Sequence, residues 1–550
     1  MSWLRLITLI TLIGVTACGG KEETGVVGTV RGFSGGAVAD EPRAARIAAD
    51  MLSAGGTAAD AAVALYFTLT VTLPSVATLG GGGVCVVYDG KQNRGQILDF
   101  MPRPPANGGP IAVPSAARGM AALHALYGKL RWEQVVGPAE NLARFGVPVS
   151  RALAADLLAA APTLAADPEL ARIYLSDGKP YAEGQMLVQR DLSTVLSAIR
   201  TRGAGELYTG PMARLFVDGA KKAGSAITLD DMRATPFAWR PAVTVKWDDN
   251  LLYFPSPPAV AGILEAQIWS MAASRWKRAA PDERAHLFAQ ASIRAWLDRQ
   301  RWLADGFKVT PSPPEIVDDD RIKALMASYQ PARRTLPPGL QPGREPDPDD
   351  AAASAFVVAD RSGNAVSCAV TPYGLFGAGH AAPGTGMVLA HTPENGRGPQ
   401  WLGPMIAVHD FGSGLPIISS FGKNAKGGYA QGDASAGSQF VFAGAASGGA
   451  AAASALVEVA LRAMIEARPL DEAVDAQRMH ADGNPPDTVF VETGVQPRVP
   501  GLADRGYKIV PVPVIGRVNA ISCPDGVIDS PDSCAFRQDR RGFGLAAGGF

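Results

Sequence analysis

Few residues of this chain have types and spacings that could do chemistry. The histidines form no His-Glu-x-x-His motif and no cluster with cysteine, so the sequence predicts no metal site. Ser420 and Lys423 fit the serine-x-x-lysine pattern of penicillin-recognising enzymes, but the partner motifs of those enzymes are absent from the sequence. No Gly-Lys-Ser/Thr phosphate loop occurs, and nothing in the sequence indicates a cofactor. The histidines are His124, His286, His380, His391, His409 and His480.

A nucleophile is the remaining possibility, and Ser354 is its candidate. This serine stands in Ala351-Ala-Ala-Ser-Ala355, directly before two strand-like segments that flank the turn Asp360-Arg-Ser-Gly-Asn364. A hydroxyl at the start of a strand can attack a carbonyl carbon once a base activates it, whereas an alanine methyl cannot. The alternative is that Ser354 is simply a polar residue at the junction of a linker and a strand.

Length and charge exclude several classes of protein. The chain has 550 residues, enough to bury a large core, and 47% of them are hydrophobic. Its 51 Lys and Arg residues balance 52 Asp and Glu residues, which leaves a net charge of -1. A balanced charge gives no electrostatic case for nucleic acid, so a small-molecule or peptide-like ligand is expected.

The N-terminus reads as an export signal. Arg5 precedes an apolar run from Leu6 to Val15, which is far shorter than the roughly 20 residues of a membrane-spanning helix. Val15-Thr-Ala-Cys18 resembles a bacterial lipobox, whose cysteine is lipidated after cleavage. We therefore expect residues 1–17 to be a lipoprotein signal peptide and residues 18–33 a tether. Cys18 would anchor the protein in the bacterial cell envelope, preferentially at the outer membrane, and the alternative is an ordinary secretory signal.

The pattern of elements indicates a mixed α and β protein. Residues 35–65 are expected to form a helix rich in small residues, and 84–88 with 96–100 a hairpin. Helical periods dominate from about 115 to 235, strands are expected at 242–246 and 251–254, and helices follow to about 305. The Pro-rich segment 336–350 cannot be a regular element, so it is expected to be an exposed linker.

The other four cysteines divide into two pairs. Cys85 and Cys368 lie in apolar strand-like runs and are expected to be buried small hydrophobic residues. Cys523 and Cys534 lie close together in a polar stretch of an exported chain, where a disulfide is one of two open possibilities.

Several motifs together resemble the γ-glutamyltransferase (glutathione hydrolase) family. They follow one another in the order of that family over roughly residues 27–550. The motifs are Pro42 to Ala64, Gly80 to Gly83, Gly205-Glu-Leu-Tyr-Thr-Gly210, Ile227 to Asp231 with Trp239-Arg-Pro241, Phe254-Pro-Ser-Pro-Pro258, Ser362-Gly-Asn-Ala-Val366 and Arg540 to Gly549.

The resemblance implies an α+β N-terminal-nucleophile hydrolase fold, a four-layer αββα sandwich. Members of this family are made as one precursor that cuts itself in two, and the new N-terminal threonine attacks a γ-glutamyl amide. Self-cleavage and catalysis both depend on that one side chain. The resemblance divides this chain into a large-subunit-like region at 34–335, the linker at 336–352 and a small-subunit-like region at 353–550.

The position of the family's threonine is occupied by alanine. Counted back without gaps from Gly363-Asn364, the threonine falls on Ala353 and the next residue is Ser354. Side chains alternate across a strand, so Ser354 is expected to point to the face opposite that of the family's nucleophile.

The positions that bind the glutamyl group are altered as well. The family's arginine falls on Met101, with Arg103 two residues later, and methionine cannot form a charge-assisted fork on a carboxylate. The family's acidic partner for the substrate amine falls on Asn395, and its paired serines fall on Gln400-Trp401. Arg103 and Asn395 remain candidates for binding a substrate.

Two features of the family's machinery are retained. Gly448 and Gly449 match the glycine pair whose backbone N–H groups form an oxyanion hole, and Thr371 matches the threonine that supports the nucleophile. Each also has a structural explanation, because paired glycines permit tight turns and a β-branched residue suits a strand.

Two hypotheses of different classes follow. The first is a lipid-anchored envelope protein with this fold and impaired or no γ-glutamyl transfer, which serves as a binding or assembly module for protein partners that the sequence does not identify. The second is a divergent γ-glutamyl amide hydrolase or transferase that uses Ser354 after autocatalytic cleavage. Loss of the nucleophile, the arginine and the paired serines together favours the first.

Overall fold

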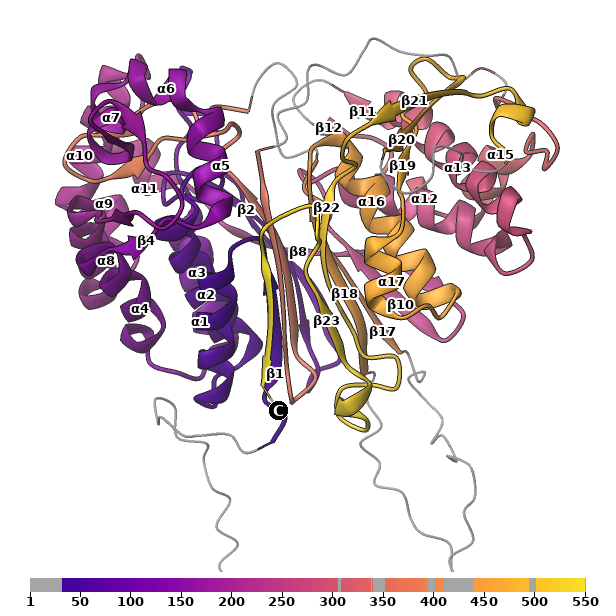
Figure 1. The fold of residues 1–550 in the computed structure, drawn as a ribbon, viewed down its shortest axis with the longest axis horizontal. Coiled ribbons are helices and arrows are strands. Elements are labelled where there is room, and N and C mark those ends of the chain that lie inside the picture. Colours follow the sequence, from indigo (N-terminus) through magenta and orange to yellow (C-terminus); the bar gives the residue numbers. More distant parts are fainter. Residues whose placement is uncertain are drawn as a thin grey trace, which may run out of the picture.

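Two β-sheets lie face to face at the centre of the molecule, and helices cover the outer face of each sheet (Figure 1). The computed structural model describes residues 32–304, 308–337, 339, 352–393, 401–409, 439–493 and 501–549. The expected α+β class and the four-layer αββα arrangement are both confirmed.

The first sheet joins strands from both ends of the chain. Its seven strands run in the order β24 (Leu545–Gly549), β1 (Gly35–Ala39), β13 (Ser354–Asp360), β14 (Ala365–Thr371), β2 (Gly82–Asp89), β3 (Arg94–Phe100) and β8 (Ala238–Pro241). All neighbouring strands of this sheet pair antiparallel. The expected hairpins β2–β3 and β13–β14 are therefore present, and they lie side by side.

The second sheet packs against the first. Its order is β23 (Ala535–Arg537), β22 (Arg517–Ser522), β18 (Gln439–Ser447), β17 (Met405–His409), β10 (Asn250–Phe254) and β9 (Val243–Trp247). The strands expected at 242–246 and 251–254 correspond to β9 and β10. A small separate sheet contains β19 (Met479–His480), β20 (Thr488–Glu492) and β21 (Lys508–Val512).

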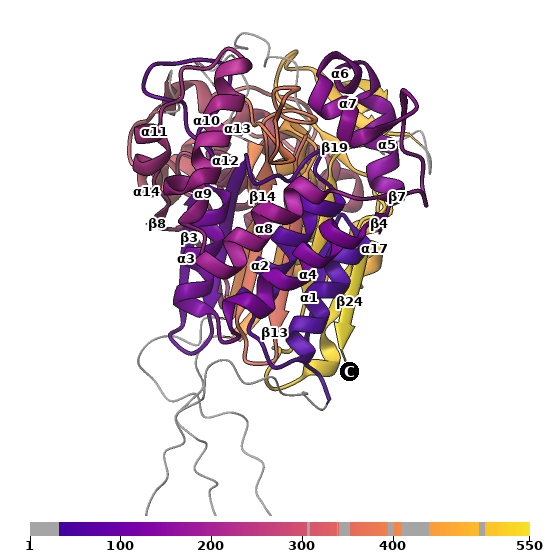
Figure 2. The same cartoon turned by 90° about the vertical axis from the view of Figure 1, so that its left-hand side faces the viewer.

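Helices of the first half cover the first sheet, as the view in Figure 2 shows, and helices of the second half cover the other. On the first side lie α1 (Pro42–Ser53), α2 (Ala58–Thr72), α3 (Ala116–Tyr127), α4 (Trp132–Phe145) and α8 (Arg190–Arg202), and on the other α12 (Ala261–Trp276), α13 (Pro281–Trp302) and α16 (Ala450–Ala460). The shorter helices are α5 (Arg151–Ala159), α6 (Ala161–Ala166), α7 (Pro168–Tyr174), α9 (Glu206–Thr209), α10 (Pro211–Lys222), α11 (Leu229–Ala234), α14 (Pro313–Ile316), α15 (Asp319–Met326) and α17 (Leu470–Asp475).

The single helix expected over residues 35–65 is wrong. The segment contains β1 and two helices, and α1 ends before Gly55, whose φ of 88° leaves the helical region. Thr57 then starts α2, because its side chain accepts from the Asp60 amide while the Asp60 carboxylate accepts from the Thr57 amide. Every residue of α2 is buried, so its lack of a polar face reflects its position in the core.

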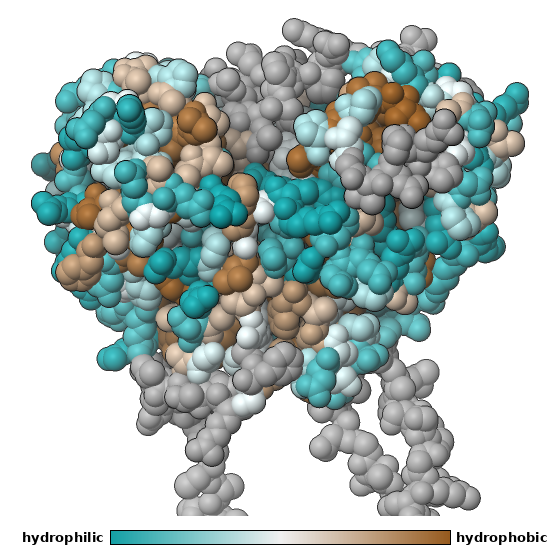
Figure 3. Space-filling view, viewed as in Figure 1, coloured by the Kyte–Doolittle hydropathy of each residue, from teal (hydrophilic) through white to brown (hydrophobic). Residues whose placement is uncertain are grey.

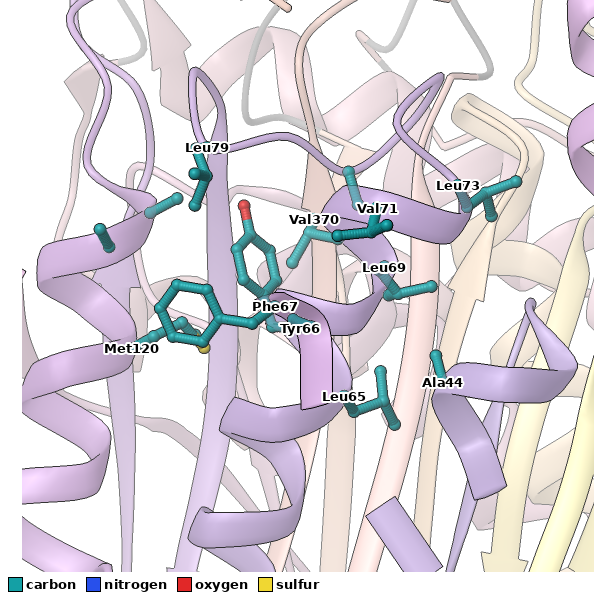
Figure 4. Packing of buried hydrophobic residues seen from close by; sticks show 14 of the residues in the cluster. Ala44, Leu65, Tyr66, Phe67, Leu69, Val71, Leu73, Leu79, Met120 and Val370 are labelled. Atoms are coloured by element: carbon teal, nitrogen blue, oxygen red, sulfur yellow. The ribbon is translucent and has the colours of Figure 1, made fainter. Parts of the chain in front are cut away.

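Three buried apolar clusters separate the four layers. One lies between the first sheet and its helices, where α2 inserts Leu65, Tyr66 and Phe67 beside Met120 (Figure 4). A second lies between the other sheet and helices α12, α13 and α16. The third fills the space between the two sheets, and we call it the inter-sheet cluster. Alternate residues of one strand therefore enter different clusters.

Both pairs of cysteines are disulfide-bonded. The bond between Cys523 and Cys534 settles the question that the sequence left open. Cys85 and Cys368 are buried as expected, but the expectation that they are merely small hydrophobic residues is wrong. They stand opposite each other on the neighbouring strands β2 and β14, which brings their sulfurs together although 283 residues separate them.

The face of the molecule seen in Figure 3 mixes hydrophilic and hydrophobic residues. Within the described ranges, no helix has both the length and the hydropathy that a membrane span needs.

Candidate functional site

Four strand ends of the first sheet meet at one edge, opposite the chain's C-terminus in Figure 1. β13 begins there with Ser354 paired to Val370, and β14 ends with Thr371 paired to Gly82. Gly83 of β2 pairs in turn with Phe100 at the end of β3. We call this the upper edge, and it brings the candidate residues at 353–354, 371 and 101–103 into one region.

Ala353 and Ser354 point into different layers at this edge. Ala353 belongs to the inter-sheet cluster together with Ala355 and Val357. Ala352 and Phe356 belong to the cluster under the helices, and Ser354 shares their side of the strand. The residue at the family's nucleophile position thus faces the second sheet, and Ser354 faces the helices.

Ser354 is fully buried and held by Asp40, which follows β1. Its Oγ donates to Asp40 Oδ2 over 3.1 Å, and the Ala355 amide donates to the same oxygen over 2.9 Å. Asn519 of β22 donates from Nδ2 to Asp40 Oδ1 and to the Ala355 carbonyl, both over 2.8 Å. This network ties three distant segments together, and its hydrogen bonds account for the polarity of Ser354 without a catalytic role.

Thr371 supports the segment that precedes β13. Its Oγ1 donates to the Ala352 carbonyl over 2.5 Å and accepts from the Tyr373 amide over 2.8 Å. The structure therefore brings Thr371 next to the position of Ala353. A nucleophile at 353 would stand beside it.

Gly448 and Gly449 join β18 to α16 near the same edge. Asn519, which contacts Asp40, pairs with Ala445, and the glycines follow three and four residues later. Their φ values of 119° and 63° favour glycine, and a Cβ on Gly448 would lie 2.8 Å from the Gly516 Cα. Backbone amides at the start of a helix can stabilise an oxyanion, and Gly448 and Gly449 lie directly before the first residue of α16.

Arg103 is engaged in an ion pair. Its Nη2 lies 2.5 Å from Asp99 Oδ2, and Arg240 Nε donates to that same oxygen over 2.9 Å. Met101, at the family's arginine position, is fully buried in the inter-sheet cluster that also holds Ala353. Apolar side chains occupy both positions where the family's chemistry would need a hydroxyl and a guanidinium.

Three predicted positions, Cys18, Asn395 and Gln400, lie outside the described residues. Trp401, the second residue at the family's paired serines, is described and packs on α13. Its ring centroid lies 5.2 Å from that of Trp296, and the Arg299 guanidinium lies 5.1 Å from it. The indole of Trp401, held by these contacts, stands at a position where the family has the small hydroxyl side chain of serine.

Three notable residues had not been identified from the sequence. Asp40 and Tyr373 gave no signal, because their roles depend on contacts between distant segments. Glu265 did give a signal in the sequence, because it is an acidic residue within the apolar run Ala259–Ala266. It is buried on α12 with Oε2 unpaired among the described atoms, and a Cβ on Gly403 would overlap its Oε1. Burial raises the pKa of Glu265 well above its ordinary value.

Within the described ranges, no three His, Cys, Asp or Glu side chains group as possible metal ligands. At the upper edge Thr371 lies beside the segment that contains Ala353, and Gly448 and Gly449 precede α16.

Comparison with known proteins identifies the family of this chain. The model of the family described as Gamma-glutamyltranspeptidase matches residues 44–395. The glutathione hydrolase proenzyme of Pseudomonas aeruginosa is 27% identical over 504 residues, which covers 84% of this chain and 85% of that protein. The acylase ACY 1 proenzyme of Pseudomonas sp. (strain V22) is 29% identical over 550 residues. That alignment covers 90% of this chain and 91% of the acylase.

Among solved structures, cephalosporin acylase from Bacillus halodurans is similar with a TM-score of 0.73 at 19% identity, covering 94% of this chain and 96% of that one. This likeness confirms the N-terminal-nucleophile hydrolase fold. The family match over 44–395 includes both the strands of the upper edge and the position of Ala353. The chain belongs to the gamma-glutamyltranspeptidase family.

Proposed function

We propose that this protein is a lipid-anchored member of its family that has little or no γ-glutamyl transfer activity and acts as a binding or assembly module in the bacterial envelope. The observation that carries the proposal is the alternation at the upper edge. Ala353 faces the inter-sheet layer, where it offers no nucleophile, and Ser354 is turned to the helices and bound by Asp40. Self-cleavage and acyl transfer both need a hydroxyl on the inter-sheet face, at the position that Ala353 occupies.

Loss of substrate contacts supports the same conclusion. Met101 places a fully buried apolar side chain at the position where a carboxylate of a γ-glutamyl group would need a cation. Trp401 packs on Trp296, so an indole stands where the family has a serine. Restoring the nucleophile alone would leave these two positions changed.

A second candidate function is an active amide hydrolase that uses Ser354. The contact that favours it is the 3.1 Å hydrogen bond from Ser354 Oγ to Asp40, since a carboxylate can accept the proton of a nucleophilic hydroxyl. The relatives named as proenzymes of a glutathione hydrolase and an acylase suggest a γ-glutamyl or another amide as its substrate. This candidate requires the start of β13 to rotate Ser354 out of its buried position.

Electrophoresis of the purified mature protein under reducing, denaturing conditions separates the two candidates. A single uncut chain with no turnover of γ-glutamyl-4-nitroanilide is expected. Two fragments whose smaller piece begins at Ser354 on N-terminal sequencing, and which disappear in Ser354→Ala, would establish the second candidate instead.

Lipid anchoring through Cys18 is a separate part of the proposal, based on the lipobox-like Val15-Thr-Ala-Cys18. Detergent phase partitioning tests it. The wild-type protein is expected in the detergent phase and Cys18→Ser in the aqueous phase. Equal partitioning of the two would show that the signal is an ordinary secretory one.

A further inference from the structure

A pocket of about 200 Å³ lies beside α7 and the start of α8. Both helices lie on the side of the molecule that faces the viewer in Figure 2. The pocket shares no residue with the upper edge, so it is a separate site. Its lining consists of Arg172 and Ile173 of α7, residues 188–192 and Gly386.

One part of this pocket offers donors to an anion. No side chain caps the N-terminus of α8, a helix of 13 residues, so its first backbone amides remain available. Such a helix end attracts negative charge. Arg190 is exposed, and its guanidinium makes no ion pair within the described ranges. Arg172 adds a second guanidinium to the lining.

Another part of the pocket offers acceptors. Gln189, the N-cap residue of α8, is only 4% exposed, and its Nε2 donates to the Val71 carbonyl over 2.7 Å. Because a carbonyl can only accept, this contact fixes which end of the carboxamide is the oxygen. That oxygen, Oε1, accepts from no described atom, although buried acceptors are normally paired. The Asp191 carboxylate also lines the pocket, so a ligand with N–H donors suits this part.

The charges around the pocket are balanced. Arg172 and Arg190 supply two positive charges. Asp191 and Glu169 supply two negative charges, and both carboxylates contact Arg172. A ligand with one kind of charge would be attracted by one pair and repelled by the other, whereas a zwitterion satisfies both pairs. The pocket therefore favours a ligand that carries an ammonium close to an oxyanion.

Exposed apolar side chains lie at the mouth of this pocket. Val188 lines the pocket and is 41% exposed, while Met186 is 54% and Phe145 73% exposed. A Cβ on Gly146 would lie 2.9 Å from both Met186 Sδ and Val188 Cγ2, so these two side chains converge over the residue that follows Phe145. We call Phe145, Met186 and Val188 the rim cluster. Exposed apolar residues grouped beside a polar site mark a surface that contacts another apolar surface.

We propose that the pocket and the rim cluster bind a phospholipid with an ethanolamine headgroup at a membrane surface. The ammonium donates to Gln189 Oε1 and to Asp191, and the phosphodiester accepts from Arg190 and the first amides of α8. The rim cluster meets the glycerol and acyl part of the lipid.

The order of exposure supports a lipid rather than a free headgroup. The unpaired acceptor of Gln189 is buried, Arg190 is exposed, and the apolar side chains project furthest into solvent at Phe145. A headgroup that enters from a membrane presents its ammonium first, then its phosphate, and its acyl chains last. The inference stands apart from the proposed function, because it uses no residue of the upper edge.

Isothermal titration calorimetry tests the recognition of the headgroup. The full mature chain carries Cys18→Ser, which removes the proposed anchor, and is titrated with glycerophosphoethanolamine. Saturable binding is expected, whereas glycerophosphocholine, whose methylated nitrogen has no N–H donor, is not expected to bind. Arg190→Gln should weaken binding of glycerophosphoethanolamine about tenfold, the effect of one charge-assisted contact. Arg46→Gln on α1 is the matched control, since Arg46 is also exposed and unpaired within the described ranges.

Cosedimentation with vesicles tests the lipid source. The same chain is expected to bind phosphatidylcholine vesicles only when they contain phosphatidylethanolamine. Phe145→Ser should weaken vesicle binding at least about fivefold and leave the titration with glycerophosphoethanolamine unchanged. Ile528→Ser is the matched control, because Ile528 is an equally apolar exposed residue that lies near Gly363 instead.

Four results would overturn the inference. They are no saturable binding of glycerophosphoethanolamine, equal binding of glycerophosphocholine, unchanged affinity in Arg190→Gln, and binding of the free headgroup without binding of the vesicles. The last result would identify a soluble zwitterion as the ligand. Self-cleavage of the chain would refute the proposed function and would leave this inference standing.

Discussion

Ser354 and Asp40 lie 314 residues apart and share a hydrogen bond of 3.1 Å at the upper edge of the first sheet. Ala353, the residue before Ser354, belongs to the inter-sheet cluster. One step along a strand therefore separates a position that could take part in acyl transfer from one that maintains the fold.

Substitutions at Ser354 and Asp40 are expected to affect stability unequally. Ser354→Ala removes one of the donors to Asp40, which keeps the Ala355 amide and Asn519, so the free energy of unfolding should fall by about 1 kcal/mol. Asp40→Ala leaves several buried donors without an acceptor and should cost more, about 2–4 kcal/mol. Urea unfolding measures both, and a larger loss for Ser354→Ala than for Asp40→Ala would contradict the network described.

Restoring a hydroxyl at position 353 is expected to restore self-cleavage. Ala353→Thr places a nucleophile in the inter-sheet layer, beside Thr371 and near Gly448 and Gly449. Fragments should appear on a reducing gel, with residue 353 as the new N-terminus, while turnover of γ-glutamyl-4-nitroanilide stays low because Met101 is unchanged. Ala352→Thr is the matched control, because Ala352 belongs to the cluster under the helices. Cleavage in the control alone would show that the faces are assigned incorrectly.

Glu265 is expected to make stability fall as pH rises. Burial raises its folded-state pKa well above the ordinary value of 4.5, so between these two pKa values the folded state binds more protons than the unfolded state. The stabilisation is complete below about pH 4.5 and is lost at up to about 1.4 kcal/mol per pH unit above it. Glu265→Gln should remove this slope, making the variant more stable than the wild type at pH 7.5.

Urea unfolding at pH 4.5, 6 and 7.5 measures the effect of Glu265. Glu133→Gln serves as the control, because Glu133 is an exposed carboxylate at the start of α4. A difference between wild type and Glu265→Gln that stays constant with pH would refute the role assigned to burial.

The two disulfides are expected to contribute unequally to stability. A bond constrains the unfolded chain more when it closes a longer loop, and the sequence separations are 283 residues for Cys85–Cys368 and 11 for Cys523–Cys534. Replacing the first pair with alanine should cost about 3 kcal/mol more than replacing the second, by the chain-entropy relation. Equal losses in urea unfolding would show that residual structure or native packing, rather than loop length, sets their contributions.

Local patterns were sufficient to predict much of the fold. The turn at Asp360–Asn364 follows from its composition, and the Asp360 carboxylate indeed accepts from the amides of Ser362 and Asn364. The strands on either side alternate between two buried layers, which is why the opposite orientations of Ala353 and Ser354 could be predicted from sequence position alone.

Contacts between distant segments could not be predicted in this way. The Cys85–Cys368 bond depends on the order of β2 and β14 in the sheet, and the Ser354–Asp40 bond on the place of β1 next to β13. The Tyr373 hydroxyl, which has no hydrogen-bond partner among the described atoms, lies in the loop after β14, whose Pro372 packs close to Gly81. Periodicity within one segment carries no information about which segment lies beside it.

The Cys85–Cys368 bond has a further consequence for any cut in the linker. Cys85 lies in the large-subunit-like region and Cys368 in the small-subunit-like region, so hydrolysis at residue 353 would sever the backbone while one sulfur bridge still joined the pieces. Proteolysis would then yield one molecule of almost unchanged mass with two new termini, and only a reductant would make the pieces separable. The two halves would thus remain in a one-to-one ratio as long as the compartment stays oxidising.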